Sequence, residues 1–172
     1  MVRALFFALA MTSAIALAAV PPVRAQAVAD PGRSPDAAFV AKASDATAID
    51  AELARLAVTR ARAVKVKAFA KQVLVAHAAL ARELAAMGRT SPLAPPPDAM
   101  KAVAALRSEP SERFEAAFVA AMVASRESAV ALFEAESRDG RDAEVKEWAA
   151  RQLPALREQL EAVRALRPRP SS

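Results

Sequence analysis

The chain offers very few side chains that could carry out chemistry. It has one histidine, His77, and no cysteine, which excludes thiol nucleophiles, disulfides, zinc–thiolate centres and iron–sulfur clusters. A Ser-His-acid triad would have to use His77, yet no serine stands in the strained, glycine-flanked turn that such a nucleophile needs. A glycine-rich phosphate loop is absent as well. We therefore predict no catalytic residue and no cofactor-binding residue.

Metal binding is the chemistry that a helical chain with one histidine could still perform. Di-iron centres in helical bundles take a Glu from each of two helices and a Glu-x-x-His motif from each of the other two. Leu74 stands three residues before His77, so this motif is missing. A reduced site for iron or manganese stays open as an alternative, because carboxylate-rich sites can bind these metals. Its candidate ligands are Glu52, His77, Glu127 and Glu158.

A structural role is the simpler interpretation of His77. The residue falls on the apolar face of its predicted helix, so we expect it to be partly buried and to need hydrogen-bond partners. Glu52 or Glu158 could supply one, and Arg126 could pair with the same carboxylates. The predicted buried polar network consists of Glu52, His77, Arg126, Gln152 and Gln159.

The N-terminus has the three parts of a cleavable signal peptide over residues 1–25. Arg3 precedes an apolar run, Ala4–Val20, which Pro21 and Pro22 end. The run is shorter than the roughly 20 residues that span a bilayer, and we expect cleavage after Ala25. No later segment is expected to span a membrane. The predicted location is therefore the periplasm or the exterior of the cell.

The rest of the chain has the composition of a helical protein, with only 3 glycines and no tyrosine. After a linker over residues 26–35, apolar spacing predicts long helices to about residues 62 and 87, a short helix over 98–106, and long helices to about 138 and 166. Residues 167–172 form a tail. Ser44–Thr47 is expected to bend the first helix, and Pro154 to kink the last near Ala150.

These elements predict an all-α domain over residues 36–166. The four long helices suit an antiparallel four-helix bundle, with a long Pro-rich connection and the short extra helix between the second and third. Ferritin-like bundles have a long connection at this place.

Sequence motifs along all four long helices resemble those of a bacterial exported family called domain of unknown function 4142. They are Phe39–Ala43 with Ala51–Ala57, Val66–Gln72, Ala129–Glu134 and Leu153–Glu158. The resemblance covers about Asp36–Leu166 and implies a ferritin-like bundle of unknown biochemical role.

The resemblance also implies histidine at positions 77, 126 and 159, and Asp at position 76. This chain has His77, Arg126, Gln159 and Ala76 there. Arg126 would place a permanent cation where a metal ligand would stand.

The distribution of charged residues indicates which classes of partner the protein can bind. The net charge is +5, and the basic run from Arg60 to Lys71 contains no acid. Nucleic-acid binding would need basic residues massed on one face, preferably with aromatic side chains for stacking. We interpret this run as a solvated helix face or helix junction, and weak membrane-surface contact is an alternative. We predict an exported, non-enzymatic helical-bundle protein that binds a protein partner or maintains the cell envelope. The alternative is a ferritin-like metal-binding protein or oxidase.

Overall fold

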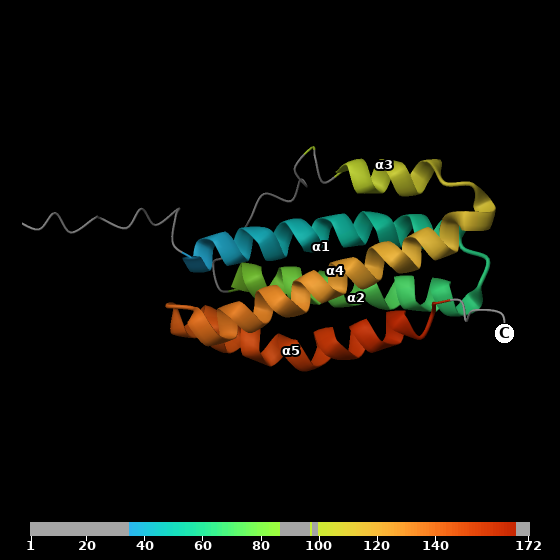
Figure 1. Cartoon of the computed structure of the whole chain (residues 1–172). Helices are drawn as coiled ribbons and strands as arrows, with labels where there is room; N and C mark the ends of the chain where they lie inside the picture. Colours follow the sequence, from blue (N-terminus) through green and yellow to red (C-terminus); the bar gives the residue numbers. More distant parts are fainter. Residues whose placement is uncertain (1–34, 87–96, 98–99, 168–172) are drawn as a thin grey trace, which may run out of the picture.

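The computed structural model describes residues 35–86, 97 and 100–167, and every regular element in these ranges is a helix. The elements are α1 (Pro35–Arg60), α2 (Val64–Ala86), α3 (Met100–Ser108), α4 (Ser111–Asp139) and α5 (Ala143–Arg164) (Figure 1). The prediction of an all-helical fold is confirmed. The predicted signal peptide, linker, most of the Pro-rich connection and most of the tail lie outside the described residues.

The four long helices pack as two pairs, α1 with α2 and α4 with α5, and the pairs join mainly through contacts between α1 and α4 (Figure 1). The short helix α3 lies on the outside, against α1 and α4. The backbones of α2 and α5 approach each other less closely than those of α1 and α2 or of α4 and α5. The seam between α2 and α5 is therefore closed by side chains.

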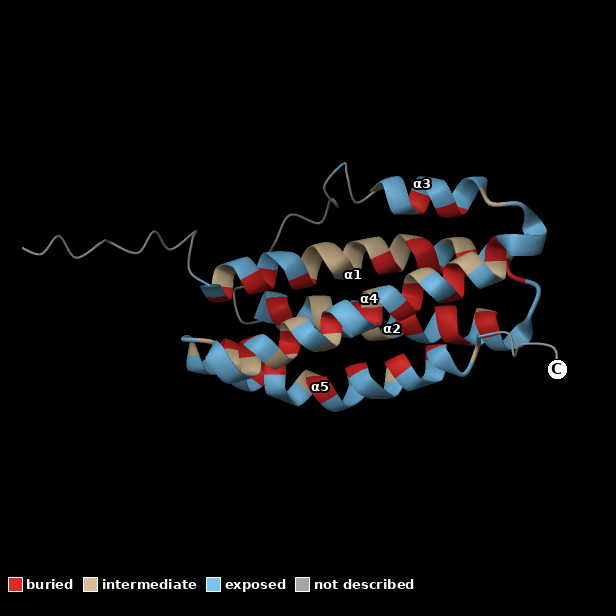
Figure 2. Cartoon of the chain, viewed as in Figure 1, coloured by how far each residue is buried: buried red, intermediate tan, exposed pale blue. Residues whose placement is uncertain are grey.

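Apolar side chains fill the interior in two clusters, and the buried faces of the helices point towards each other in Figure 2. One cluster surrounds the edge-to-face pair of Phe69 and Phe118. In the other, Phe39 contacts Phe133 and Trp148 with ring centroids 5.0 and 6.0 Å away. Each predicted long helix thus contributes apolar residues to the core, because their spacing matches the helical repeat.

Arg60 fixes the short helix to the rest of the domain. Its guanidinium donates to the carbonyl oxygens of Leu106, Arg107 and Glu109 at 2.6–3.1 Å, and it lies 4.3 Å from the ring centroid of Phe114. The C-terminal carbonyls of a helix have no partner within the helix, so this cation caps α3.

The turn between α4 and α5 is held by two carboxylates. Asp142 accepts hydrogen bonds from the N–H groups of Glu144 and Val145 and so caps α5. Asp36, at the start of α1, accepts from the N–H groups of Arg141 and Asp142 at 2.8 and 3.0 Å. The first turn of α1 is thereby attached to the α4–α5 turn.

Two segments that the sequence marks as irregular are continuous helix. α1 runs without a break through Ser44–Thr47, where the Thr47 hydroxyl donates to the carbonyl of Ala43 at 2.7 Å. α5 continues through Pro154.

The expectation that no later segment is apolar enough to span a membrane is wrong by length and hydropathy. Over the described residues α4 alone passes that test. α4 packs against α1 and α5 and carries the buried cation Arg126. A helix in the core of a protein can have the same apolar composition.

Candidate functional site

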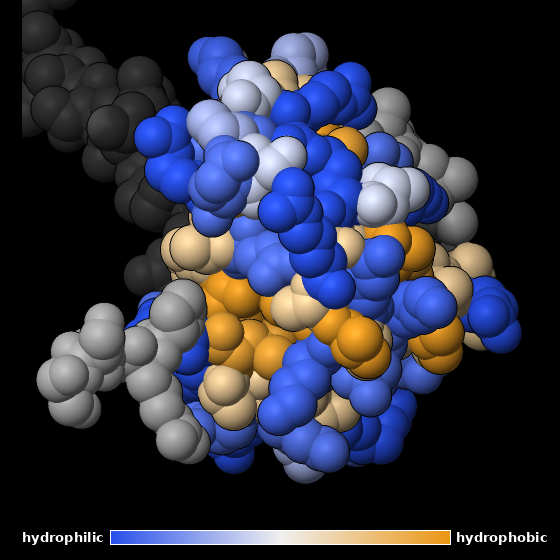
Figure 3. Space-filling model, turned by 90° about the vertical axis from the view of Figure 1, so that its right-hand side faces the viewer, coloured by the Kyte–Doolittle hydropathy of each residue, from blue (hydrophilic) through white to orange (hydrophobic). Residues whose placement is uncertain are grey.

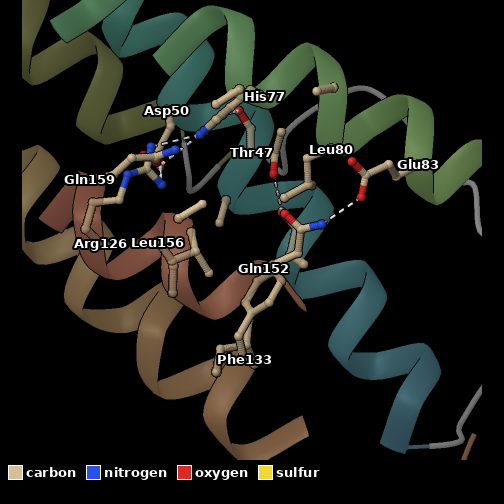
Figure 4. A pocket seen from close by; sticks show the side chains of 17 residues that line it. Thr47, Asp50, His77, Leu80, Glu83, Arg126, Phe133, Gln152, Leu156 and Gln159 are labelled. Carbon is tan, nitrogen blue, oxygen red and sulfur yellow. Dashed lines mark hydrogen bonds and ion pairs between the residues drawn. The ribbon is translucent and has the colours of Figure 1, made fainter. Parts of the chain in front are cut away.

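Three charged or titratable side chains meet in the interior, one from each of α1, α2 and α4. Asp50, His77 and Arg126 are 2 %, 7 % and 2 % exposed. The Nη1 atom of Arg126 lies 3.0 Å from Oδ2 of Asp50, and its Nη2 lies 2.8 Å from Nε2 of His77 (Figure 4). The hydroxyl of Ser125 donates to the Asp50 carboxylate at 2.8 Å. The cluster thus joins three of the four long helices.

The hydrogen bonds of His77 fix its protonation. Its Nδ1 lies 2.8 Å from the carbonyl oxygen of Thr47, which can only accept, so Nδ1 carries the proton. Its Nε2 faces a guanidinium, which can only donate, so Nε2 is a lone-pair acceptor. Burial and the charge of Arg126 lower the pKa of His77, against smaller opposing effects of Asp50 and the Thr47 carbonyl. The ring is therefore neutral, and its 4.0 Å separation from Asp50 is not an ion pair.

Asp50 and Arg126 form the charged part of the cluster. Burial lowers the pKa of Arg126, and the Asp50 carboxylate opposes that effect. A buried ion pair loses its hydration, so each partner depends on the other and on the surrounding hydrogen bonds. Ser125 and His77 supply those additional bonds.

A cavity of about 160 Å³ lies beside this cluster, with walls from α1, α2, α4 and α5. Its polar end is formed by Asp50, His77, Arg126 and Gln159 (Figure 4). Much of the rest of its wall is apolar and includes Leu80, Phe133, Leu156 and six alanines, which are Ala43, Ala46, Ala76, Ala79, Ala129 and Ala155. The small alanine side chains leave the space open.

Two buried polar atoms on the wall of this cavity have no hydrogen-bond partner. They are Nε of Arg126, a donor, and Oε1 of Gln159, an acceptor. A third such atom, Oε1 of Glu136, does not lie on this wall. Buried polar atoms are almost always paired in folded proteins, so unpaired ones call for a water molecule or a ligand.

The cavity adjoins the seam between α2 and α5. A shallower groove of about 480 Å³ lies along this seam and shares Ala76, Ala155 and Gln159 with the cavity. At the other end of the cavity, Glu83 of α2 accepts hydrogen bonds from Trp148 and Gln152 of α5, both at 2.7 Å. These polar contacts join α2 to α5 at one end of the cavity, and the groove opens the seam at the other.

The four residues considered as metal ligands lie in separate surroundings. Glu52 is half-buried and pairs with Arg55 on its own helix. Glu127 is exposed and pairs with Arg164 at 2.8 Å, while Glu158 is exposed on the groove. No group of three or more His, Cys, Asp or Glu side chains that could hold a metal occurs in the part of the chain that the structure describes.

The residues do not fit an iron or manganese centre. A metal would need the lone pair on Nε2 of His77, and that atom already accepts a hydrogen bond from Arg126. The guanidinium would also repel a cation at this point. We therefore derive no metal chemistry for this cavity.

The predicted network needs correction in its partners. The structure brings His77, Arg126 and Gln159 to one cavity, but Asp50 takes the place expected for Glu52 or Glu158. Gln152 also lines the cavity, where its amide binds Glu83. Glu52 falls outside because it lies at the edge of the apolar face of α1.

Sequence reasoning missed Asp50, although a signal for it existed. Asp50 stands seven residues after Ala43 and seven before Ala57, and both are buried. A heptad spacing keeps residues on one helix face. An acid at this position must therefore face the interior, where it needs a cation.

Comparison with known proteins identifies the family of this chain. The family model described as "Domain of unknown function (DUF4142)" matches residues 21–166. The chain belongs to the DUF4142 family. No curated protein matches the sequence, and no solved structure matches it. The four positions that the resemblance singled out, 76, 77, 126 and 159, all line the cavity of this DUF4142 protein.

Proposed function

We propose that this DUF4142 protein is an exported, non-enzymatic binding protein of the cell envelope, and that the cavity between its long helices is the binding site. The observation that carries the proposal is the combination of an open cavity with a polar end that leaves one donor and one acceptor unpaired. The charged and titratable groups at this end, Asp50, His77 and Arg126, bond to one another, so the site is suited to holding a ligand.

The cavity suits a small molecule. Apolar cavities of about 150 Å³ in proteins bind one benzene-sized ligand, and this cavity is of that size. The seam between α2 and α5 offers a route of entry, because the groove along it adjoins the cavity and shares Ala76, Ala155 and Gln159 with it.

Toluene is a suitable probe for this proposal, because it tests for apolar binding without any polar contact. Titration into protein with ¹³C-labelled alanine methyl groups should shift the signals of the alanines on the cavity wall. Ala76→Leu, which fills the space where cavity and groove meet, should weaken toluene binding by about tenfold or more. Ala78→Leu is the matched control, since Ala78 is exposed on the same helix and does not line the cavity. Equal binding by wild type and Ala76→Leu, or shifts confined to other alanines, would contradict the proposal.

The arrangement of the long helices supports an antiparallel four-helix bundle of ferritin-like topology as the scaffold. Three residues join α1 to α2 and three join α4 to α5, whereas the connection that contains α3 is long. Short connections place consecutive helices side by side in opposite directions.

Export is supported by the sequence of residues 1–25, with its charged start, apolar run and small residue at the cleavage point. The mass of the protein isolated from the periplasmic fraction or the medium tests this. A chain that begins at Gln26 is expected, and a full-length chain in the cytoplasm would refute export.

A second candidate function is weak contact with an anionic lipid surface. The residues at the start of α2, at one end of the molecule, support it. Val64, the first residue of α2, is 81 % exposed between Arg62 and the basic side chain of Lys65. Figure 3 looks onto this end and shows apolar surface bordered by hydrophilic side chains. Arg60 does not contribute, because it caps α3. Sedimentation with phosphatidylglycerol vesicles should be lost in Val64→Asp and at high salt; sedimentation unaffected by either would contradict this contact.

A further inference from the structure

The unpaired atoms at the polar end of the cavity define what kind of group can bind there. Nε of Arg126 offers a hydrogen to an acceptor, and Oε1 of Gln159 offers a lone pair to a donor. A ligand that satisfies both must therefore donate one hydrogen bond and accept another. Hydroxyl groups and primary amides do both, whereas a carboxylate only accepts and an ammonium group only donates.

The charge of the site also favours a neutral group over a charged one. Arg126 is already balanced by the Asp50 carboxylate at 3.0 Å, and the neutral ring of His77 adds no charge. A charged ligand group at this end would be buried without a free counter-charge, which is costly, because Glu83 lies at the other end of the cavity, where it bonds Trp148 and Gln152. The polar end of the cavity therefore favours a neutral ligand.

The remaining wall sets the size and the apolar part of the ligand. Leu80, Phe133 and Leu156 surround a space about as large as one benzene ring, and the alanines line the rest. A ligand with a small apolar body can fill this space while its polar group reaches Arg126 and Gln159 (Figure 4). A longer ligand can extend into the adjoining groove between α2 and α5.

We propose that the cavity is a selective site for small neutral compounds with a hydroxyl or primary amide group on an apolar body, bound through Nε of Arg126 and Oε1 of Gln159. This inference rests on the proposed function, because it requires the cavity to accept a ligand. It goes further by assigning the chemical class of the ligand and the two atoms that recognise it.

Five ring compounds of nearly equal size test the proposal. Benzyl alcohol and benzamide present a group that donates and accepts, toluene presents none, benzoate is anionic and benzylamine is cationic. Dissociation constants from NMR titration should rank the alcohol and the amide about tenfold or more tighter than toluene, a gain of the size expected for buried hydrogen bonds. Benzoate and benzylamine should bind more weakly than toluene.

Gln159→Leu provides the matched variant. It removes the acceptor but keeps a side chain of similar size, so the preference for benzyl alcohol over toluene should disappear while toluene still binds. Gln72→Leu is the control, because Gln72 is exposed and lines only the groove; it should keep the preference. Toluene binding in Gln159→Leu also shows that the variant is folded.

The outcomes separate this inference from the proposed function. If toluene binds as tightly as benzyl alcohol, the two polar atoms are satisfied by water and the inference fails, although the cavity remains a binding site. Preferential binding of benzoate would also overturn it. If none of the five compounds binds, both the inference and the proposed function fail.

Discussion

Arg126 donates a hydrogen bond from Nη2 to Nε2 of His77 at 2.8 Å, so the lone pair of the chain's one histidine is occupied by a cationic side chain. This relationship turns a residue type that is often a metal ligand into part of a hydrogen-bonded cluster. It also explains how the cluster can be buried: Asp50 matches the charge of Arg126, and both ring nitrogens of His77 have a hydrogen-bond partner.

Metal binding should therefore be absent from this site. Purified protein offered iron, manganese and zinc, then dialysed, is expected to retain no more metal than His77→Gln treated in the same way, because Nε2 is not free to coordinate. Elemental analysis by mass spectrometry gives the amounts. One or two equivalents of metal in the wild type that are lost in His77→Gln would revive the ferritin-like alternative.

Substitution of Asp50 should lower the free energy of unfolding more than substitution of any other carboxylate of the domain. Asp50→Asn keeps the shape of the side chain but leaves the buried Arg126 without a counter-charge, a change that typically costs about 3–5 kcal/mol of unfolding free energy. Urea unfolding monitored by circular dichroism measures it. Asp45→Asn on the same helix is the control and should change the stability by less than about 0.5 kcal/mol. Equal effects of the two substitutions would show that the ion pair does not stabilise the fold.

Glu136 should make the protein less stable as the pH rises. Burial, the hydrogen bond with Asp36 and the charges of Asp36 and Asp142 raise its pKa to about 7, with Lys146 as a weak opposing charge. The folded state then binds a proton that the unfolded state has lost, so stability falls between about pH 4.5 and 7. Glu136→Gln should flatten this part of the pH profile of thermal unfolding.

The control for that profile is Glu147→Gln, because Glu147 is exposed and has only a 3.9 Å contact with Arg151. It should leave the pH profile as in the wild type. The raised pKa of Glu136 would be contradicted if Glu136→Gln and Glu147→Gln gave the same profile.

His77 should make the protein more stable as the pH rises, opposite to the effect of Glu136, over part of the same pH range. Its pKa is lowered in the folded state from 6.5, chiefly by burial. As the pH falls below about 6.5, the unfolded chain takes up a proton that the folded ring refuses, so acid destabilises the fold. In the Glu136→Gln background this contribution stands alone, and melting temperatures should rise from pH 5 to 7. A flat profile in Glu136→Gln that is unchanged by adding His77→Gln would contradict the neutral ring.

Arg60 should hold α3 in place. Arg60→Gln removes most of the donors to the last carbonyls of α3 and the contact with the Phe114 ring. Amides of α3 are expected to exchange hydrogen about tenfold faster or more, while amides in the middle of α4 are unaffected. Arg62→Gln serves as the control, because the side chain of Arg62 is exposed at the same turn. Equal protection of α3 in both variants would remove Arg60 from this role.

The sequence predicts the helices well because local signals determine them. Apolar spacing and helix-favouring composition locate the long helices to within a few residues, and Asp142 has the residue type expected of a cap. Ser44–Thr47 shows the limit of such signals. Weak helix formers there predicted a weakened, bent segment, and the structure has continuous helix across it, with the Thr47 hydroxyl bonded to the carbonyl of Ala43.

The site was harder to predict because it depends on contacts between helices. His77, Arg126 and Gln159 could be placed on inward faces from the sequence, yet their partners could not, because the acid that reaches them from α1 depends on how the helices pack. Glu83 illustrates the same limit, because its hydrogen bond from Trp148 joins two helices that are far apart in the sequence. The cavity itself arises from alanines on four helices and becomes evident only when the helices are packed.

The most direct test of the account is a crystal structure of the purified protein soaked with benzyl alcohol at high resolution. We predict electron density for one molecule inside the cavity, with its ring against Leu156 and Phe133 and its hydroxyl between Nε of Arg126 and Oε1 of Gln159. A cavity that holds only water under these conditions, or one that has closed through contact between α2 and α5, would contradict the claim that this DUF4142 protein binds small ligands there.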